Sequence, residues 1–170
     1  MATLGPQDGT LTVKTGRKGA ASKAGHDLTI EVARWEATLE LGDSPSMSLT
    51  ADSRSFKVLQ GTGGVKSLDE DDKANIQKTI DDEVLKGSAI QFRSTGVAVD
   101  GERLIVNGEL ELAGKRQPIS FDLLHTGGRL AGSAVVHQPT WGMKPYSALF
   151  GTLKVADEVT VSIDARVPTT

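Results

Sequence analysis

Residues 104–136 read LIVNGELELAGKRQPISFDLLHTGGRLAGSAVV, and this stretch decides the fold class. Apolar side chains recur in it at every second position, as at Leu110 and Leu112, and Thr126-Gly127-Gly128 has the composition of a hairpin turn. A period of two places one face of each strand against a core and the other in water. The stretch therefore predicts consecutive half-buried strands.

The same alternation continues outward in both directions, from about Gly9 to Val167. It is carried by Leu11 and Val13, by Leu28, Ile30 and Val32, by Ala37, Leu39 and Leu41, by Met47, Leu49 and Ala51, by Ile90 and Phe92, by Val97 and Val99, and by Val159, Val161, Ile163 and Ala165. Roughly nine or ten short runs of this kind predict an all-β sandwich or barrel. At Leu104-Ile105-Val106 either face could point inward.

One segment reads as a helix, over about residues 68–86. Ser67 and Glu70 have the spacing of a capping box, acidic residues follow, and Lys86-Gly87 is a typical stop. Ile76, Ile80 and Val84 form one narrow apolar stripe. Such a helix is expected to lie on a barrel or to plug its end.

Composition bounds the remaining classes. A chain of 170 residues suffices for a single domain, residues 1–170, with a real core. The net charge of −3, with basic residues scattered along the chain, argues against nucleic acid as a partner. The chain has 0 cysteines, so disulfides and thiolate sites are excluded. The sequence shows neither a signal-peptide pattern nor a membrane-spanning run, so we expect a cytoplasmic protein without stable membrane insertion.

Motifs for chemistry are weak. In Gly61-Thr62-Gly63-Gly64-Val65-Lys66-Ser67, Val65 separates glycine from lysine, whereas a phosphate-binding loop needs them consecutive. His26, His125 and His137 lack metal-ligand spacing, and no serine stands in a nucleophile elbow. We therefore expect neither a cofactor, nor a metal, nor a catalytic residue.

Two clusters remain, Gly25-His26-Asp27-Leu28 and the segment 141–150. The second holds Trp141, Tyr146 and Phe150 beside Lys144. These rings either seal one end of a barrel as plain core or form the walls of a ligand mouth with polar groups nearby. The residues alone leave both readings open.

These pieces, in order, resemble the YceI-like family of bacterial proteins. The resemblance is carried by Gly25-His26-Asp27-Leu28, the helix leading into Ile90-Gln91-Phe92-Arg93-Ser94, the run from Gly108 to Ile119, and Trp141-Gly142-Met143-Lys144, and it covers about Gly9 to Val167. Position 141 is commonly Phe in that family. The resemblance implies an extended antiparallel lipocalin-like β-barrel whose apolar lumen holds an isoprenoid or another long amphiphile.

On that reading the protein binds, carries or sequesters a polyprenyl or acyl chain and is not an enzyme. The expected lumen residues are Leu28, Ile30, Val32, Leu39, Phe92, Leu110, Phe121, Leu123, Val136 and Phe150. The expected mouth residues are His26, Asp27, Trp141, Lys144 and Tyr146. Eight strands leave room for side chains or one slender molecule, and the lumen would be about 25 Å long.

Two rival functions are a filled barrel that serves as an interaction or stress-response module, and an enzyme for an apolar substrate with His26 and Asp27 as acid and base. Neighbouring residues on a strand face opposite ways, so adjacency gives the enzyme no support. A homodimer is one assembly that the sequence leaves open.

Overall fold

A computed structural model describes residues 2–18, 27–62, 70, 74, 78, 85, 87–143, 147–148 and 153–167, with side chains for most of them. The elements are β1 (Ala2–Leu4), β2 (Gly9–Lys18), β3 (Asp27–Val32), β4 (Trp35–Glu40), β5 (Ser46–Ala51), β6 (Phe56–Thr62), β7 (Ile90–Asp100), β8 (Arg103–Leu112), β9 (Lys115–Thr126), β10 (Arg129–His137), the 3-10 helix η2 (Gln138–Trp141), β11 (Ser147–Ala148) and β12 (Leu153–Arg166).

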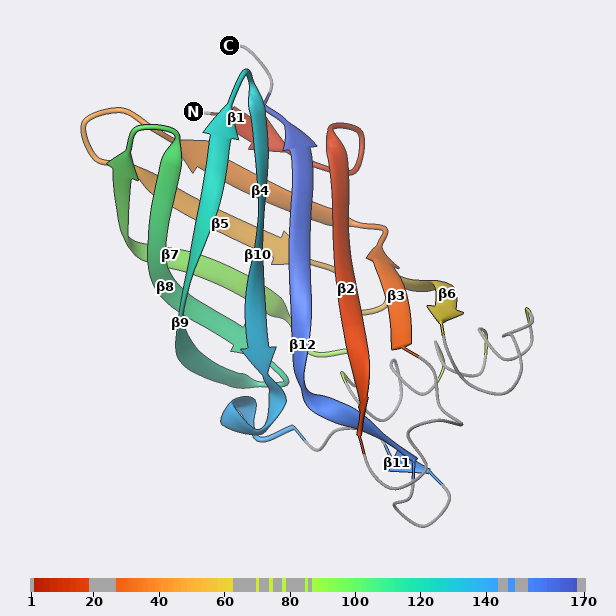
Figure 1. The fold of residues 1–170 in the computed structure, drawn as a ribbon. Coiled ribbons are helices and arrows are strands. Elements are labelled where there is room, and N and C mark those ends of the chain that lie inside the picture. Colours follow the sequence, from red (N-terminus) through yellow and green to blue (C-terminus); the bar gives the residue numbers. More distant parts are fainter. Residues whose placement is uncertain are drawn as a thin grey trace.

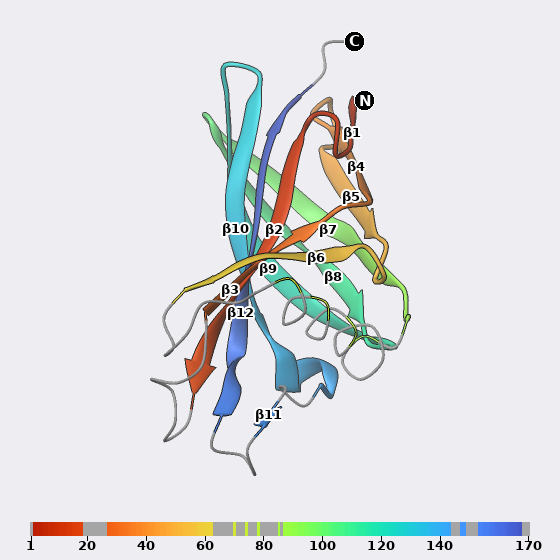
Figure 2. The same cartoon turned by 90° about the vertical axis from the view of Figure 1, so that its right-hand side faces the viewer.

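All strand pairs are antiparallel and belong to one curled sheet, ordered β1-β4-β5-β7-β8-β9-β10-β12-β2-β3-β6, with β11 paired to β12 (Figure 1). Seen from the side, β10 and β12 face β1, β4 and β5 across the molecule (Figure 2). The expected all-β, antiparallel, lipocalin-like architecture is confirmed.

The curled sheet closes through one long bent hairpin, residues 27–62. β3 and β4 are two halves of one bent strand, as are β5 and β6. β3 pairs with β2 on its other side, whereas β5 pairs with β7. Strand pairing runs from β5 through β7, β8, β9, β10, β12 and β2 to β3. The chain itself, at the bends between β3 and β4 and between β5 and β6, joins the two ends of this path into a ring. The ring is the barrel wall.

Hydrogen bonds hold the bend of this hairpin. The N–H of Ala33 donates to the carbonyl of Ser55 at 2.8 Å, and the N–H of Asp52 donates to the carbonyl of Arg34 at 3.0 Å. The buried hydroxyl of Ser55 accepts from the N–H of Arg34 at 3.0 Å and donates to the carbonyl of Asp52 at 2.8 Å. Ser55 therefore satisfies backbone groups that the bend takes out of the strand ladder.

Several finer predictions can now be compared with the structure. Leu104 and Val106 are 1% and 0% exposed, so they are the inward face of β8. Positive φ values of 59° and 76° at Gly127 and Gly128 fit the predicted hairpin turn. β1 was not predicted. The predicted helix over 68–86 falls mostly outside the described residues; Glu70, Ala74 and Lys78, which are described, are helical and exposed.

Candidate ligand-binding interior

The end of the barrel that carries the turns at Gly101 and Gly127 is filled by side chains, and we call it the packed end. A cluster of buried residues fills it, to which Leu4 of β1 contributes a fully buried side chain. Its members are Leu4, Leu11, Val32, Trp35, Ala37, Leu39, Met47, Phe92, Leu104, Val106, Leu123, Leu130, Ile163 and Ala165. No ligand chain could pass through this end without displacing core side chains.

An aromatic pair lies at the inner boundary of this cluster. The rings of Phe92 and Phe121 are 5.2 Å apart between centroids and tilted by 55°. They fit because Gly108 opens the inward face of β8: a Cβ there would lie 2.7 Å from the Phe92 ring and 2.4 Å from the carbonyl oxygen of Arg93. A bulge in β7 between Ser94 and Gly96 faces the same point.

The opposite end carries η2 and the turn at residues 113–114, and we call it the η2 end. A smaller cluster of buried residues lies there, made of Leu85, Ile90, Val136, Trp141 and Met143. Five partly buried side chains pack against both this cluster and the larger one: Ala51, Phe56, Leu110, Ile119 and Val161. They point inward yet keep some exposure, so the middle of the interior is less tightly filled than the packed end.

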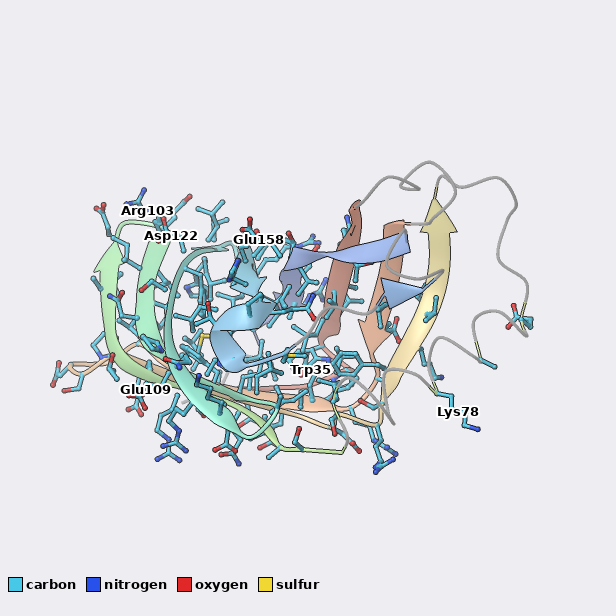
Figure 3. All side chains as sticks on the ribbon, turned by 90° about the horizontal axis from the view of Figure 1, so that it is seen from below. Trp35, Lys78, Arg103, Glu109, Asp122 and Glu158 are labelled. Atoms are coloured by element: carbon cyan, nitrogen blue, oxygen red, sulfur yellow. The ribbon has the colours of Figure 1, made fainter. Side chains whose placement is uncertain are left out.

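η2 is fixed by its tryptophan. The indole N–H of Trp141, a residue 4% exposed, donates to the carbonyl of Leu110 at 2.8 Å. Pro139 is the second residue of the short helix, and Gly142 ends the helix in the left-handed region, with φ of 72°. A view along the barrel from this end shows the ribbon of η2 crossing the opening (Figure 3). η2 therefore lies across part of this end of the barrel.

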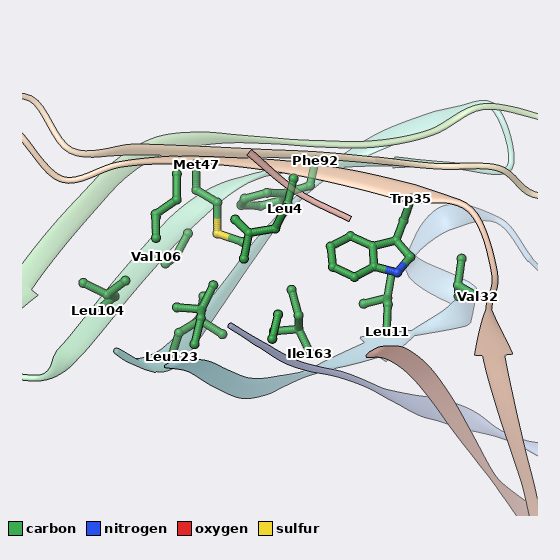
Figure 4. Close-up of a cluster of buried hydrophobic side chains, with 14 residues drawn as sticks. Leu4, Leu11, Val32, Trp35, Met47, Phe92, Leu104, Val106, Leu123 and Ile163 are labelled. Atoms are coloured by element: carbon green, nitrogen blue, oxygen red, sulfur yellow. The ribbon is translucent and has the colours of Figure 1, made fainter. Parts of the chain in front are cut away.

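Trp35 is the second buried indole, and sequence reasoning did not single it out. It is 5% exposed, and its Nε1–H finds no acceptor among the described residues. It begins β4 directly after the bend, opposite Ala51, which contacts both clusters. Close up, its nitrogen lies on the ring edge facing Leu11 and Val32, away from Leu4, Met47 and Phe92 (Figure 4).

The predicted lumen residues divide by height along the barrel. Val32, Leu39, Phe92 and Leu123 are core of the packed end, and Ile30 is also buried. Leu110 and Phe121 are partly buried, and Val136 belongs to the cluster at the η2 end. The side chain of Leu28 and the whole of Phe150 lie outside the described residues.

Of the predicted mouth residues, Trp141 and the backbone of Asp27 are described. Asp27 begins β3 opposite Thr62, and its place in the sheet is at the end that also carries η2. His26, Lys144 and Tyr146 lie outside the described residues. Buried Gln138 at the start of η2 joins this end of the barrel and was not predicted, because a glutamine outside an alternating run carries no sequence signal for burial.

An open groove of about 570 Å³ lies in the wall where β9 and β10 part. Their pairing covers only Asp122–Thr126 and Arg129–Ser133, so β9 diverges from β10 beyond Asp122. Phe121 and Leu123 line the groove, together with Leu124 and short or charged residues. The groove is too open to enclose an apolar chain.

Charged side chains lie on the outside. Glu109, Asp122, Arg103 and Glu158 are all exposed and point away from the barrel (Figure 3). Arg129 donates a bidentate pair of hydrogen bonds to the carboxylate of Asp164, Nε to Oδ1 and Nη2 to Oδ2, each at 2.6 Å. This pair lowers the pKa of the Asp164 carboxyl. Within the described part of the chain, no group of His, Asp and Glu side chains could hold a metal ion.

A meandering antiparallel sheet, curled into a ring around an apolar interior, defines a lipocalin-like barrel. The sequence model of the YceI-like domain matches residues 6–167 of this chain. The chain therefore belongs to the YceI-like family. None of the described helical residues belongs to a segment long and apolar enough to span a membrane.

Solved structures share this fold. BcnA of Burkholderia cenocepacia is similar with a TM-score of 0.64 and 16% identity, over 94% of this chain and 96% of that one. A mutant CJ YceI protein, CJ-N182C, whose structure contains a monobromobimane guest, is similar with a TM-score of 0.61 and 10% identity, over 83% of this chain and 85% of its own. No protein with a curated description matches the sequence.

Proposed function

We propose that this protein binds one long apolar amphiphile, such as an isoprenoid or acyl chain, inside the η2 half of its barrel, as a carrier or a sequestering protein and not as an enzyme. The main support is a set of inward, partly buried apolar side chains between the two clusters, notably Leu110, Ile119 and Phe56. Binding of an apolar chain would cover this half-exposed apolar surface and remove it from water, which is favourable.

The geometry limits the length of chain that is enclosed. Gly108 marks the floor and Leu112 lies near the end of β8, and four residues of strand span about 14 Å. This is shorter than the lumen expected from full-length strands, because the packed end is filled. Each buried methylene contributes about 0.8 kcal/mol, so even a partly enclosed tail binds usefully.

The mouth in this proposal is the η2 end, with Trp141 as its covering side chain. Asp27 lies at the same end, and His26, Lys144 and Tyr146 remain proposed head-group residues. Leu28 and Phe150 remain proposed members of the wall.

Native mass spectrometry of gently purified protein, followed by organic extraction, tests this proposal. We expect about one amphiphile per chain. Leu110→Asp, which places a charge in the interior, should abolish retention, whereas Glu109→Lys, on the outer face, should not. Leu110→Trp fills the same space without charge and should also release the ligand from a folded barrel. Equal retention in all three variants would refute the lumen assignment.

The filled packed end favours one alternative, a barrel that acts only as an interaction module. That alternative would be supported if the protein is purified without a bound ligand and also fails to bind added isoprenoids and fatty acyl chains.

A further inference from the structure

We infer that the indole N–H of Trp35 is the hydrogen-bond donor for a neutral oxygen of the bound amphiphile, which therefore enters the barrel with a carbonyl or hydroxyl group foremost. The inference rests on the proposed function and specifies its ligand. It starts from a buried donor with no acceptor among the described residues. Such a donor loses its hydrogen bond to water on folding and gains none in the protein, so its burial is unfavourable.

Burial becomes uneven beyond the donor edge of this ring. Leu11 and Ile163 are 5% and 7% exposed, and Ile30 and Val58 stay buried, but Val13 and Val161, two positions along from Leu11 and Ile163 on the same face, are only partly buried. Phe56, opposite Val32, is also partly buried and contacts both clusters. The Trp35 N–H thus lies where the packed end meets the less filled middle.

The neighbours of Trp35 also define the charge of the acceptor. The cluster members around the junction are apolar, and the buried hydroxyl of Ser55 at the nearby bend is already bonded to the backbone of Arg34 and Asp52. None of the charged side chains that the structure describes is buried. A carboxylate or phosphate placed there would be desolvated without a cation, which is strongly unfavourable. A single N–H donor in apolar surroundings instead suits one amide, ester, ketone or alcohol oxygen. A trapped water would fit poorly, because it needs two or more polar partners.

Nuclear magnetic resonance gives a direct test, because the chain has 2 tryptophans and therefore two indole N–H signals. The signal lost in Trp35→Phe identifies Trp35. Delipidated wild-type protein is titrated with a straight-chain fatty amide and with the alkane of the same length. We expect the fatty amide, but not the alkane, to move the Trp35 indole N–H signal downfield and to slow the exchange of this proton with water. A proton that already resonates as hydrogen-bonded in the delipidated protein would overturn the inference.

Affinities provide the second arm. Trp35→Phe should weaken binding of the amide roughly tenfold relative to the alkane. The ratio of the two affinities is the measured quantity, because it cancels any loss of packing. Leu11→Val, a packing change beside the same ring edge, should leave the ratio unchanged.

The outcomes separate this inference from the proposed function. If wild-type protein binds both ligands and Trp35→Phe leaves their ratio unchanged, the lumen stands and the role of Trp35 is refuted. If wild-type protein binds neither ligand, both proposals fail.

Discussion

The Trp141 indole N–H donates to the carbonyl oxygen of Leu110 at 2.8 Å, which joins η2 to β8 across the end of the barrel. This bond connects the segment that follows β10 with a strand two places away in the sheet. η2 is therefore held as part of the barrel end and is not a loose connection.

Loss of this bond should destabilise the fold. Trp141→Phe keeps an aromatic ring but leaves the carbonyl of Leu110 without its donor, so we expect the free energy of unfolding to fall by about 1–2 kcal/mol. Urea denaturation measures it. Thr140→Ala, in the same short helix but exposed, should change stability by less than about 0.5 kcal/mol. Equal losses would mean that η2 contributes through its backbone alone.

Gly108 should tolerate no larger residue. A methyl group there would meet the carbonyl of Arg93 at 2.4 Å and the ring of Phe92, so Gly108→Ala should destabilise by about 1–3 kcal/mol. Gly96→Ala is the matched control, because nothing lies within 4 Å of a Cβ at that position. Thermal unfolding of both variants checks the prediction, and a neutral Gly108→Ala would show that the aromatic pair can move aside.

Ser55 should matter more than other serines. Ser55→Ala removes the acceptor for the N–H of Arg34 and a donor to Asp52, so we expect a loss of about 1–2 kcal/mol in chemical denaturation. Ser133→Ala, on the exposed face of β10, should be nearly neutral. If both behave alike, water replaces the Ser55 hydroxyl and the bend does not depend on it.

The Arg129–Asp164 pair should leave an acid-side signature. Hydrogen bonds from Arg129 lower the pKa of Asp164, desolvation opposes this shift, and the positive charge of Arg129 adds to it. Because the folded pKa is below the unfolded value of about 3.9, the stabilisation is present above that pH and is lost as pH falls through the folded pKa. Arg129→Gln should raise the pKa of Asp164 in a carboxyl NMR titration, and Arg103→Gln, a distant surface change, should not. The effect on stability should be small, since both groups are exposed.

The sequence predicted the walls of this barrel well because each strand has one wet face. Alternation identified the inward residues Leu110, Phe121 and Leu123 without any structure. Alternation could not tell which of these residues lie at the packed end and which lie near the η2 end, because inward residues recur at every second position along the whole strand. Leu39 and Leu123, expected in a lumen, are therefore solid core.

Trp35 escaped prediction for a different reason. Val32 and Trp35 both point inward although they are three positions apart, because the bend at Ala33 and Arg34 breaks the period of two. A pattern that counts even spacings cannot detect this. β1 escaped because three residues, of which Leu4 is fully buried, are too short to show alternation.

The seam between β2 and β12 joins residues from opposite ends of the chain, with Gly9 opposite Ala165. Every other wall seam is a local hairpin or follows a shorter connection, so this seam carries the largest loop-closure entropy. Fusing the two ends with a short linker and opening the chain at Gly101 would turn this seam into a local connection and would make the pairing of β7 with β8 the new seam. Such a circular permutant should keep the same barrel and fold at a similar rate, since the loop-closure cost is moved from one seam to the other and not removed.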